Sequence, residues 1–201
     1  VKEELNRLHT KYGKLNGLVW ASGEVDHGGI IQNREIESLT KYLKSKVHGV
    51  LLFNKYMDFS SLDFVSLFSS IGNIFYQHKF GQVAYNAANE FMESYANYLQ
   101  KSSNVHAFSI NWCDWLNVGM TYKIKQEQLA TEDTSVINAT IGDAIYPEQG
   151  VSIFHTCLQN KPSNWSIHKS DLVEEIQWYK DNLIELQSEL DMSNDSIDQT
   201  V

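Results

Sequence analysis

The chain has 201 residues, with 16 basic and 25 acidic side chains, a formal net charge of −9 and 42% hydrophobic residues. That length and apolar content suffice to bury the core of one sizeable globular domain. Residues 171–201 hold nine of the acids and one of the bases, so the preceding part of the chain is almost neutral. Because the sequence has no cluster of lysine and arginine residues to displace counterions from phosphate groups, we do not expect the chain to bind nucleic acid.

The two cysteines, Cys113 and Cys157, are too few for a disulfide scaffold and too far apart for a CxxC pair. They favour a reducing, cytoplasmic location. No apolar run is long enough to span a membrane, no signal peptide opens the chain, and the histidines and cysteines lack metal-ligand spacing, so we expect neither a membrane partner nor a metal site. The chain opens with Val1 in a helical pattern, which suggests a fragment or a processed piece.

Helices and strands alternate along the first half of the sequence. Amphipathic periodicity predicts helices over residues 2–12, 34–57 and 82–99. Short apolar runs predict buried strands over residues 18–21, 63–70 and 104–112. Strands that alternate with helices of this length indicate βαβ units and a parallel sheet, so the predicted fold class is α/β, with ligands at the carboxyl ends of the strands.

The rest of the chain has weaker signals. Residues 113–150 have no strong period, and a flexible lid over a cleft is one interpretation. A helix is predicted to begin near Pro147, and leucines at helical spacing predict another over 172–190. We place the domain boundary after residue 172, with 173–201 as an acidic helix and linker.

The stretch 68–91 contains the residues best suited to chemistry. Ser69 and Ser70 leave the end of a predicted strand, and Tyr85 opens the helix that follows. Asn89 lies four positions after Tyr85, which puts a phenol and an amide on one face of that helix. From the residues alone, simple packing or surface exposure is the commoner interpretation of such a pair.

Five motifs in a fixed order carry a family resemblance. They are "ASG" at 21–23, "KVHG" at 46–49, "FSS" at 68–70, "YNAAN" at 85–89 and "NWCDWLNVGM" at 111–120. Over residues 1–172 the chain resembles the carboxyl-terminal part of a ketoreductase domain of a modular polyketide synthase, a branch of the short-chain dehydrogenase/reductase superfamily. The resemblance implies a Rossmann-like parallel sheet with flanking helices.

The polyketide branch is suggested by one exchange of residues. Many other members of the superfamily have a lysine four residues after the tyrosine, where this chain has Asn89. The carrier-dependent ketoreductases place asparagine there and take the lysine from the preceding long helix, which corresponds to Lys46. Without the resemblance, Lys46 would be interpreted as a solvated helix lysine like Lys41 and Lys44.

The resemblance implies a role for each motif residue. Reduction of a ketone by hydride puts negative charge on the carbonyl oxygen, and Tyr85 would donate the proton that this oxygen takes. A free phenol has a pKa of about 10, so a cation such as Lys46 is needed beside it, where it would also bind the nicotinamide ribose. Ser70 would hold the carbonyl oxygen, and Asn89 would orient Lys46 or a water.

Further residues are assigned by the same resemblance to the two sides of the site. Those expected beside the cofactor, in addition to Lys46 and Tyr85, are Ala21, Ser22, Gly23 and Met120. Those expected on the substrate side are Asp26 and Trp115.

Three features depart from the family pattern. Ser70 precedes Tyr85 by 15 positions, two more than usual, and the expected position holds Gly72. We interpret this as a longer loop, with Ser69 as a weaker candidate. Many family members that give one hydroxyl configuration carry a Leu-Asp-Asp motif, of which residues 25–27 retain only the middle acid, Asp26. The tryptophan that marks the opposite stereochemical class is absent from residues 71–84, so we favour the first class.

The third departure concerns the cofactor. No glycine-rich GxGxxG turn occurs in the chain, so we expect it to lack the amino-terminal phosphate-binding βα unit and to bind NADPH poorly alone. NADPH itself is implied only by the resemblance.

The resemblance implies reduction of a β-ketoacyl thioester to the β-hydroxyacyl thioester, with the substrate held on the phosphopantetheine arm of an acyl carrier protein and with neighbouring synthase domains as partners. Two alternatives stay open. One is a stand-alone short-chain dehydrogenase acting on a free ketone or alcohol, against which Asn89 speaks. The other is a non-catalytic structural or docking segment, which the acidic helix at 173–201 supports if it is more than a solvated terminal helix.

Overall fold

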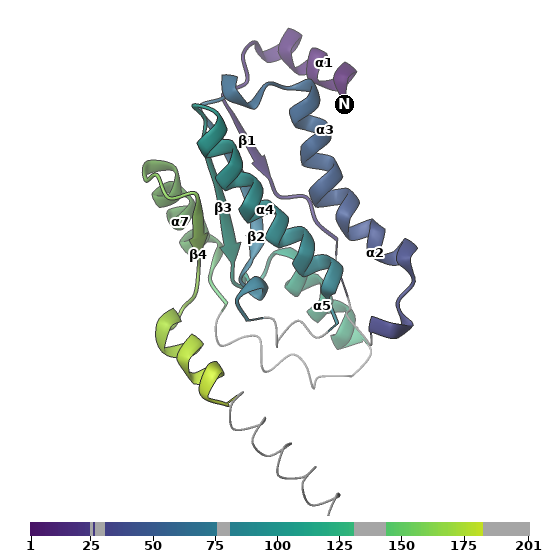
Figure 1. The fold of residues 1–201 in the computed structure, drawn as a ribbon, viewed down its shortest axis with the longest axis vertical. Helices are drawn as coiled ribbons and strands as arrows, with labels where there is room; N and C mark the ends of the chain where they lie inside the picture. The colour runs from purple at the N-terminus through teal and green to yellow at the C-terminus, as the bar shows by residue number, and fades with distance from the viewer. Residues whose placement is uncertain (25, 27–30, 76–80, 131–143, 183–201) are drawn as a thin grey trace, which may run out of the picture. The chain divides into compact units, whose positions relative to one another are not determined.

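The computed structural model of the chain describes residues 1–24, 26, 31–75, 81–130 and 144–182. Its centre is a parallel sheet with the strand order β1-β2-β3-β4 (Figure 1). The strands are β1 (Gly17–Trp20), β2 (Phe64–Ser70), β3 (His106–Trp112) and β4 (Asn164–Ser166). The predicted α/β class with a parallel sheet is confirmed. The sequence had predicted the first three strands, whereas the three residues of β4 are too few to give a pattern.

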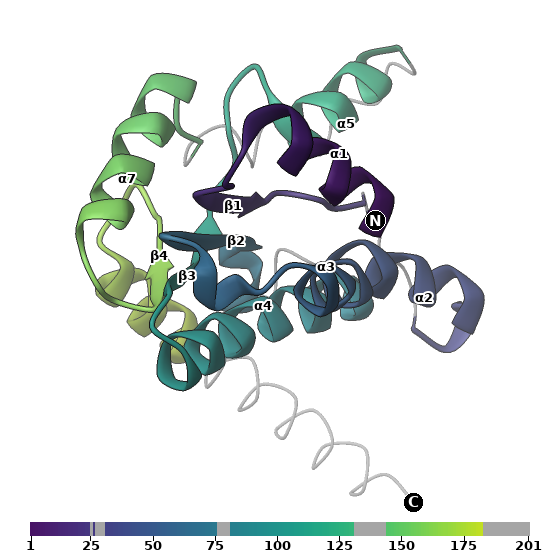
Figure 2. The same ribbon diagram turned by 90° about the horizontal axis from the view of Figure 1, so that it is seen from above.

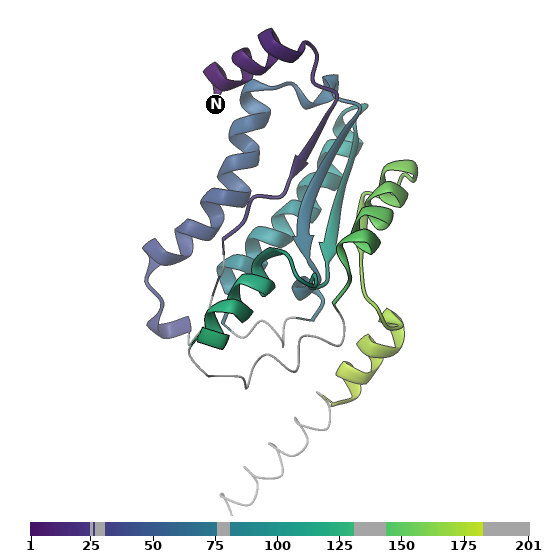
Figure 3. The same ribbon diagram turned by 180° about the vertical axis from the view of Figure 1, so that it is seen from behind.

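Helices connect these strands. They are α1 (Lys2–Tyr12), α2 (Ile36–Leu43), α3 (Gly49–Tyr56), α4 (Val83–Ser102), α5 (Gly119–Ala130) and α7 (Pro147–Gln159). A π-helical turn, η2 (Lys44–His48), joins α2 to α3, and short 3-10 turns cover Ile31–Asn33, Phe59–Ser61 and Ile71–Asn73. Figure 3 shows α5 near the carboxyl ends of the strands.

The two faces of the sheet bury two separate apolar clusters. Helices α3 and α4 cover one face, where Val50 and Met92 pack with Val65 and Leu67 of β2. Helix α7 covers the other face (Figure 2), where Phe154 lies against Phe68. Because successive strand side chains point to opposite faces, Val65 and Leu67 of β2 enter the first cluster while Phe64 and Phe68 enter the second.

The helix predicted over 34–57 is interrupted and partly differs in its buried face. The π turn separates α2 from α3, and two of the apolar residues that make up the periodic pattern, Ile36 and Leu51, are 75% and 42% exposed. The buried position between Leu43 and Val50 is instead occupied by Lys46, which is 5% exposed. Sequence periodicity identifies a buried stripe from its apolar side chains, so it does not reveal a lysine that is buried within that stripe.

The stretch 113–150, for which a flexible lid was one interpretation, contains the first residues of two helices. Helix α5 begins within this stretch at Gly119, and α7 begins at Pro147 as predicted. Residues 131–143 lie outside the described residues.

The chain divides into two compact units, residues 1–167 and 168–201. Within the second unit, residues 172–182 are helical, and the rest of the helix predicted over 172–190 lies outside the described residues. None of the helices in the described segments combines the length and the apolarity needed to cross a bilayer.

Candidate active site

A cavity of about 340 Å³ opens at the carboxyl ends of β1, β2 and β3. This edge is where parallel α/β sheets place their ligands. The sheet contributes the residues that end or follow each strand, and η2, α4 and α5 contribute the other walls. The lining residues are Ala21, Ser22, Gly23, Asp26, Lys46, Phe68, Ser69, Ser70, Gln82, Tyr85, Trp112, Cys113, Asp114, Trp115, Val118, Gly119, Met120 and Thr121.

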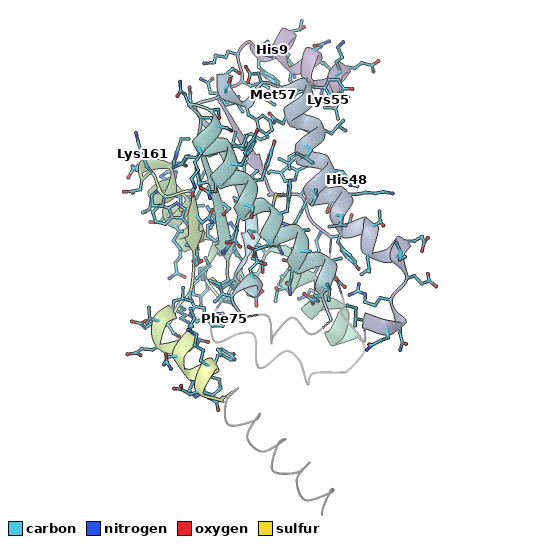
Figure 4. The ribbon with its side chains drawn as sticks, in the orientation of Figure 1. His9, His48, Lys55, Met57, Phe75 and Lys161 are labelled. Carbon is cyan, nitrogen blue, oxygen red and sulfur yellow. The ribbon has the colours of Figure 1, made fainter. Side chains whose placement is uncertain are left out.

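All the site residues expected from the sequence line this cavity except Asn89. The segments that carry them are distant in the chain and meet because parallel strands end at the same edge of the sheet. His48, the histidine nearest to Lys46 in sequence, is exposed and is not among the lining residues (Figure 4).

Lys46 is buried, whereas Lys41 and Lys44 on the same helical segment are exposed. Its ammonium Nζ donates a hydrogen bond of 2.6 Å to the backbone carbonyl of Phe68 on β2. This burial excludes the interpretation of Lys46 as a solvated helix lysine. Burial also disfavours the charged form, and it lowers the pKa of Lys46 to about 8.

Tyr85 and Asn89 lie one turn apart on α4, as their spacing predicted, but they have different surroundings. Tyr85 is half-buried and lines the cavity, so its phenol can reach a ligand there. Asn89 is fully buried behind the cavity wall, and its amide nitrogen and oxygen have no hydrogen-bond partner among the described residues. A buried amide left in this way is suited to a water or to a polar group that arrives with a ligand.

The two candidate serines differ in how their hydroxyl groups are used. The Ser69 hydroxyl donates to the backbone carbonyl of Asn89 at 3.1 Å, which ties β2 to α4. The Ser70 hydroxyl accepts a hydrogen bond of 3.2 Å from the backbone N–H of Gly72. Accepting leaves the proton of Ser70 free to be donated to a ligand, so the geometry favours Ser70 over Ser69.

Asp26 lines the cavity, but its carboxylate is engaged. Arg34 approaches both carboxylate oxygens, at 2.7 and 3.2 Å, and the two side chains are 9% and 0% exposed for Arg34 and Asp26. The same guanidinium donates to the carbonyl of Gly81, just before α4. The Asp26–Arg34 pair therefore joins the segment after β1 to the start of α4. Arg34 was not predicted from the sequence, because a lone arginine in a polar stretch gives no signal.

The far wall is fixed by the segment after β3 and the start of α5. Trp115 packs edge-on against Trp112 at 5.0 Å between ring centroids. A Cβ on Gly150 of α7 would lie 2.2 Å from the Trp115 ring, so only glycine lets α7 approach it. The Thr121 hydroxyl donates to Asp114 at 2.5 Å and holds the first turn of α5 against the cavity.

The cavity also fits the ribose and nicotinamide part of a dinucleotide. A Cβ added to Gly23 would lie 3.5 Å from Lys46 Cε and 3.8 Å from Met120 Cε, so three segments converge on the bare backbone after β1. Lys46, Tyr85 and Ser70 offer ammonium and hydroxyl donors for ribose and carbonyl oxygens on the same cavity. Apolar contact comes from Met120 and Trp112.

A model of the KR domain family matches residues 1–117, more than half of the chain and the part that holds Lys46, Ser70, Tyr85 and Asn89. The chain belongs to the ketoreductase (KR) domain family. The ketoreductase family predicted from the five motifs is thereby confirmed.

Relatives of this ketoreductase segment are large synthases. Polyketide synthase PksM of Bacillus subtilis is 29% identical over 155 residues, which are 77% of this chain and 3% of that protein. Polyketide synthase PksN of the same organism is 32% identical over 139 residues, 67% of this chain and 2% of that protein. A 6-methylsalicylic acid synthase of Penicillium expansum is 27% identical over 106 residues, 53% of this chain and 6% of that protein. The chain thus spans a small part of the relatives that it matches.

Solved structures share the fold of the ketoreductase segment. An A1-type ketoreductase has a TM-score of 0.68 at 20% identity, covering 85% of this chain and 34% of that one. A ketoreductase domain from the bacillaene assembly line has a TM-score of 0.64 at 24% identity, covering 83% and 39%. A short-chain dehydrogenase from Streptomyces avermitilis has a TM-score of 0.65 at 13% identity, covering 97% and 75%. The predicted Rossmann-like fold is confirmed.

We expect Lys46→Met to stabilise the chain at pH 7. The pKa of Lys46 is about 8 in the folded chain, below its ordinary 10.5 in the unfolded chain. Below about pH 8 the buried charge of Lys46 therefore lowers the free energy of unfolding. Removing that penalty raises the free energy of unfolding by about 1–3 kcal/mol. Between pH 8 and 10.5 the unfolded state binds the proton more tightly, so the stability of the wild type rises with pH and the gain shrinks.

Urea unfolding at pH 7 and pH 10 measures this difference, with Lys44→Met as the exposed control that should change little. Equal stability of Lys46→Met and wild type at pH 7 would contradict the burial penalty.

We expect Arg34→Met to destabilise the first unit, because it leaves the Asp26 carboxylate buried without its cation. The free energy of unfolding should fall by about 3 kcal/mol. The double variant Asp26→Asn/Arg34→Met should recover most of the loss, since both charges are then gone. Urea unfolding measures both, and Arg7→Met, which removes an exposed ion pair with Glu4, is the control. If Arg34→Met were as stable as the double variant, the unpaired Asp26 carboxylate would not destabilise the fold, which would contradict this prediction.

Proposed function

We propose that the chain is the catalytic part of a ketoreductase that reduces a β-ketoacyl thioester to the β-hydroxyacyl thioester. The observation that carries this proposal is a desolvated lysine in the same cavity as a tyrosine and a serine, at the carboxyl ends of the strands. Surface lysines are solvated, and burying one is unfavourable unless its charge is used.

The chemistry begins at the ketone carbon. A dihydronicotinamide cofactor supplies the hydride when it is bound. As the carbon–hydrogen bond forms, the π electrons of the carbonyl group move onto its oxygen, which takes a proton from the Tyr85 hydroxyl. The Ser70 hydroxyl donates a second hydrogen bond to this oxygen and stabilises the charge as it develops.

Lys46 acts on Tyr85 and on the cofactor. Its positive charge stabilises the phenolate that Tyr85 becomes, and its ammonium can donate to ribose hydroxyl groups. With a pKa of about 8, Lys46 holds a proton near neutral pH but releases it more readily than an ordinary lysine. The amide of Asn89, which has no partner among the described residues, is suited to hold Lys46 in place or to hold a water that replenishes the proton.

The finer assignments follow the relatives and the family resemblance. The synthases that match the chain are multidomain proteins, which supports neighbouring synthase domains and an acyl carrier protein with phosphopantetheine-bound substrate as partners. NADPH as cofactor is part of the same proposal. The reduced, buried cysteines Cys113 and Cys157 are compatible with the proposed cytoplasmic location.

The alternatives are less well supported. A purely structural or docking segment would not need Lys46, Ser70 and Tyr85 around one cavity. A stand-alone dehydrogenase on a free ketone has the same site chemistry, but the exchange of lysine and asparagine between Lys46 and position 89 is typical of carrier-dependent ketoreductases. Substrate form therefore separates the two enzymatic candidates.

Tyr85→Phe should abolish most of the reductase activity of the ketoreductase that carries this chain. The variant keeps the ring and removes only the proton donor, so kcat/KM should fall by about 100-fold or more. Steady-state oxidation of NADPH with a β-ketoacyl thioester on carrier protein measures it. Tyr98→Phe, on the exposed side of α4, is the matched control. Near-normal turnover by Tyr85→Phe would refute the proton donor, and faster turnover of a free ketone than of the carrier-bound substrate would favour the stand-alone dehydrogenase.

The two adjacent serines provide a second test. Ser70→Ala should lower kcat by about 100-fold, because it removes a donor to the developing oxyanion. Ser69→Ala should lower kcat by less than about 10-fold, because its hydroxyl is spent on the Asn89 carbonyl and supports only the packing of α4. The same NADPH assay compares them, and the reverse order would assign the carbonyl contact to Ser69.

A further inference from the structure

The π turn that carries Lys46 has an unusual hydrogen-bond pattern. The backbone N–H of Gly49 donates to the carbonyl groups of Lys44 and Lys46. In an α-helix this N–H would donate to the carbonyl of Ser45, four residues earlier. The π turn therefore releases the Ser45 carbonyl from its helical donor.

A side chain from β1 takes up the released carbonyl. The indole Nε1–H of Trp20 donates to the Ser45 carbonyl oxygen at 3.2 Å. Trp20 is the last residue of β1, next to the segment Ala21–Gly23 that lines the cavity. The bond thus joins the strand end directly to the turn that carries the buried lysine.

Close packing holds the same pair of elements together. A Cβ on Gly49 would lie 2.5 Å from Cζ2 of Trp20, so the indole rests on a helix surface that only a glycine leaves open. On α3, the Phe53 ring meets the Trp20 ring edge-on, with 4.9 Å between centroids. Trp20 is therefore fixed by one hydrogen bond and by contacts with two further residues of the helical segment.

We propose that Trp20 is a positioning residue for Lys46: by occupying the Ser45 carbonyl and the bare surface of Gly49, it stabilises the π turn that directs the lysine into the cavity. This inference rests on the proposed function of Lys46. π turns within α-helices are rare and occur frequently at functional sites. An indole is suited to this place because it combines a large apolar ring with one hydrogen-bond donor.

The position of Lys46 can be followed through its titration, independently of catalysis. The other titratable groups lining the cavity are Tyr85 on α4, Asp26 after β1, and Cys113 and Asp114 after β3. The Asp26 carboxylate is paired with Arg34, and burial is the cause of the lowered pKa of Lys46. A lysine that leaves the cavity regains water, so its pKa returns toward 10.5.

The test is competitive amine labelling of the 201-residue chain with trace acetic anhydride across pH 6–11, with each lysine followed by mass spectrometry. In the wild type, Lys46 should titrate with a midpoint near pH 8. In Trp20→Phe, which keeps a ring but loses the N–H, the midpoint should move up by about one pH unit or more. Exposed Lys44 should be unchanged.

The matched control is Trp165→Phe, which removes an indole N–H that has no partner among the described residues and belongs to the cluster on the other face of the sheet. It should leave Lys46 at its wild-type midpoint. Gly49→Ala adds a methyl group that meets the Trp20 ring from the helix side, so it should reproduce the effect of Trp20→Phe. Circular dichroism shows which variants are folded. If Trp20→Phe is unfolded, the Lys46 midpoint of Gly49→Ala provides the test instead.

A folded Trp20→Phe in which the Lys46 midpoint stays near pH 8 would overturn the proposal, as would the same result in Gly49→Ala where Trp20→Phe is unfolded. An equal rise of the midpoint in Trp165→Phe would overturn it too. The labelling result does not depend on reductase activity. Absence of activity from the wild-type ketoreductase would refute the proposed function and leave the role of Trp20 to the titration.

Discussion

The site depends on keeping a lysine out of water. Burial of Lys46 is unfavourable for its charged form, and a hydrogen bond from its ammonium group to the Phe68 carbonyl offsets part of this cost. Such a residue weakens the structure that holds it, which is the usual relation between stability and function at an active site. The rest of the arrangement, from the π turn to the glycine beneath Trp20, serves to keep Lys46 in that position.

Parallel strands explain why residues so far apart in sequence meet. β1, β2 and β3 end at one edge of the sheet, so the backbone after Trp20, the Ser70 hydroxyl and the segment after Trp112 come together there. Helix α4 crosses the two central strands and brings Tyr85 to the same edge. Each side chain is held by an element with its own buried face, so the positions of the catalytic candidates follow from packing of the framework.

Much of this arrangement follows from the sequence. Periodicity predicted α1, α4 and, as one continuous helix, α2 and α3, whereas α5 lies in a stretch without a strong period. Short apolar runs predicted the three longer strands and the parallel sheet, and the motifs predicted which side chains gather at its edge. The burial of Lys46 did not follow from periodicity, because a lysine in a helical pattern is normally solvated. The π turn and the Asp26–Arg34 pair depend on contacts between segments distant in sequence, and β4 is too short to have a pattern of its own. Choosing between Ser69 and Ser70 required hydrogen bonds that spacing does not reveal.

The longer connection between Ser70 and Tyr85 has a consequence for how such sites diverge. Ser70 ends a strand that pairs with β1 and β3, and Tyr85 belongs to a helix packed on β2 and β3, so the sheet holds the backbone of both residues. Because the sheet sets these positions, we expect an insertion between them to leave the two proposed catalytic residues in place, so the connection can vary in length among relatives. A search for related proteins that demands a fixed serine-to-tyrosine spacing would therefore discard true members of the family.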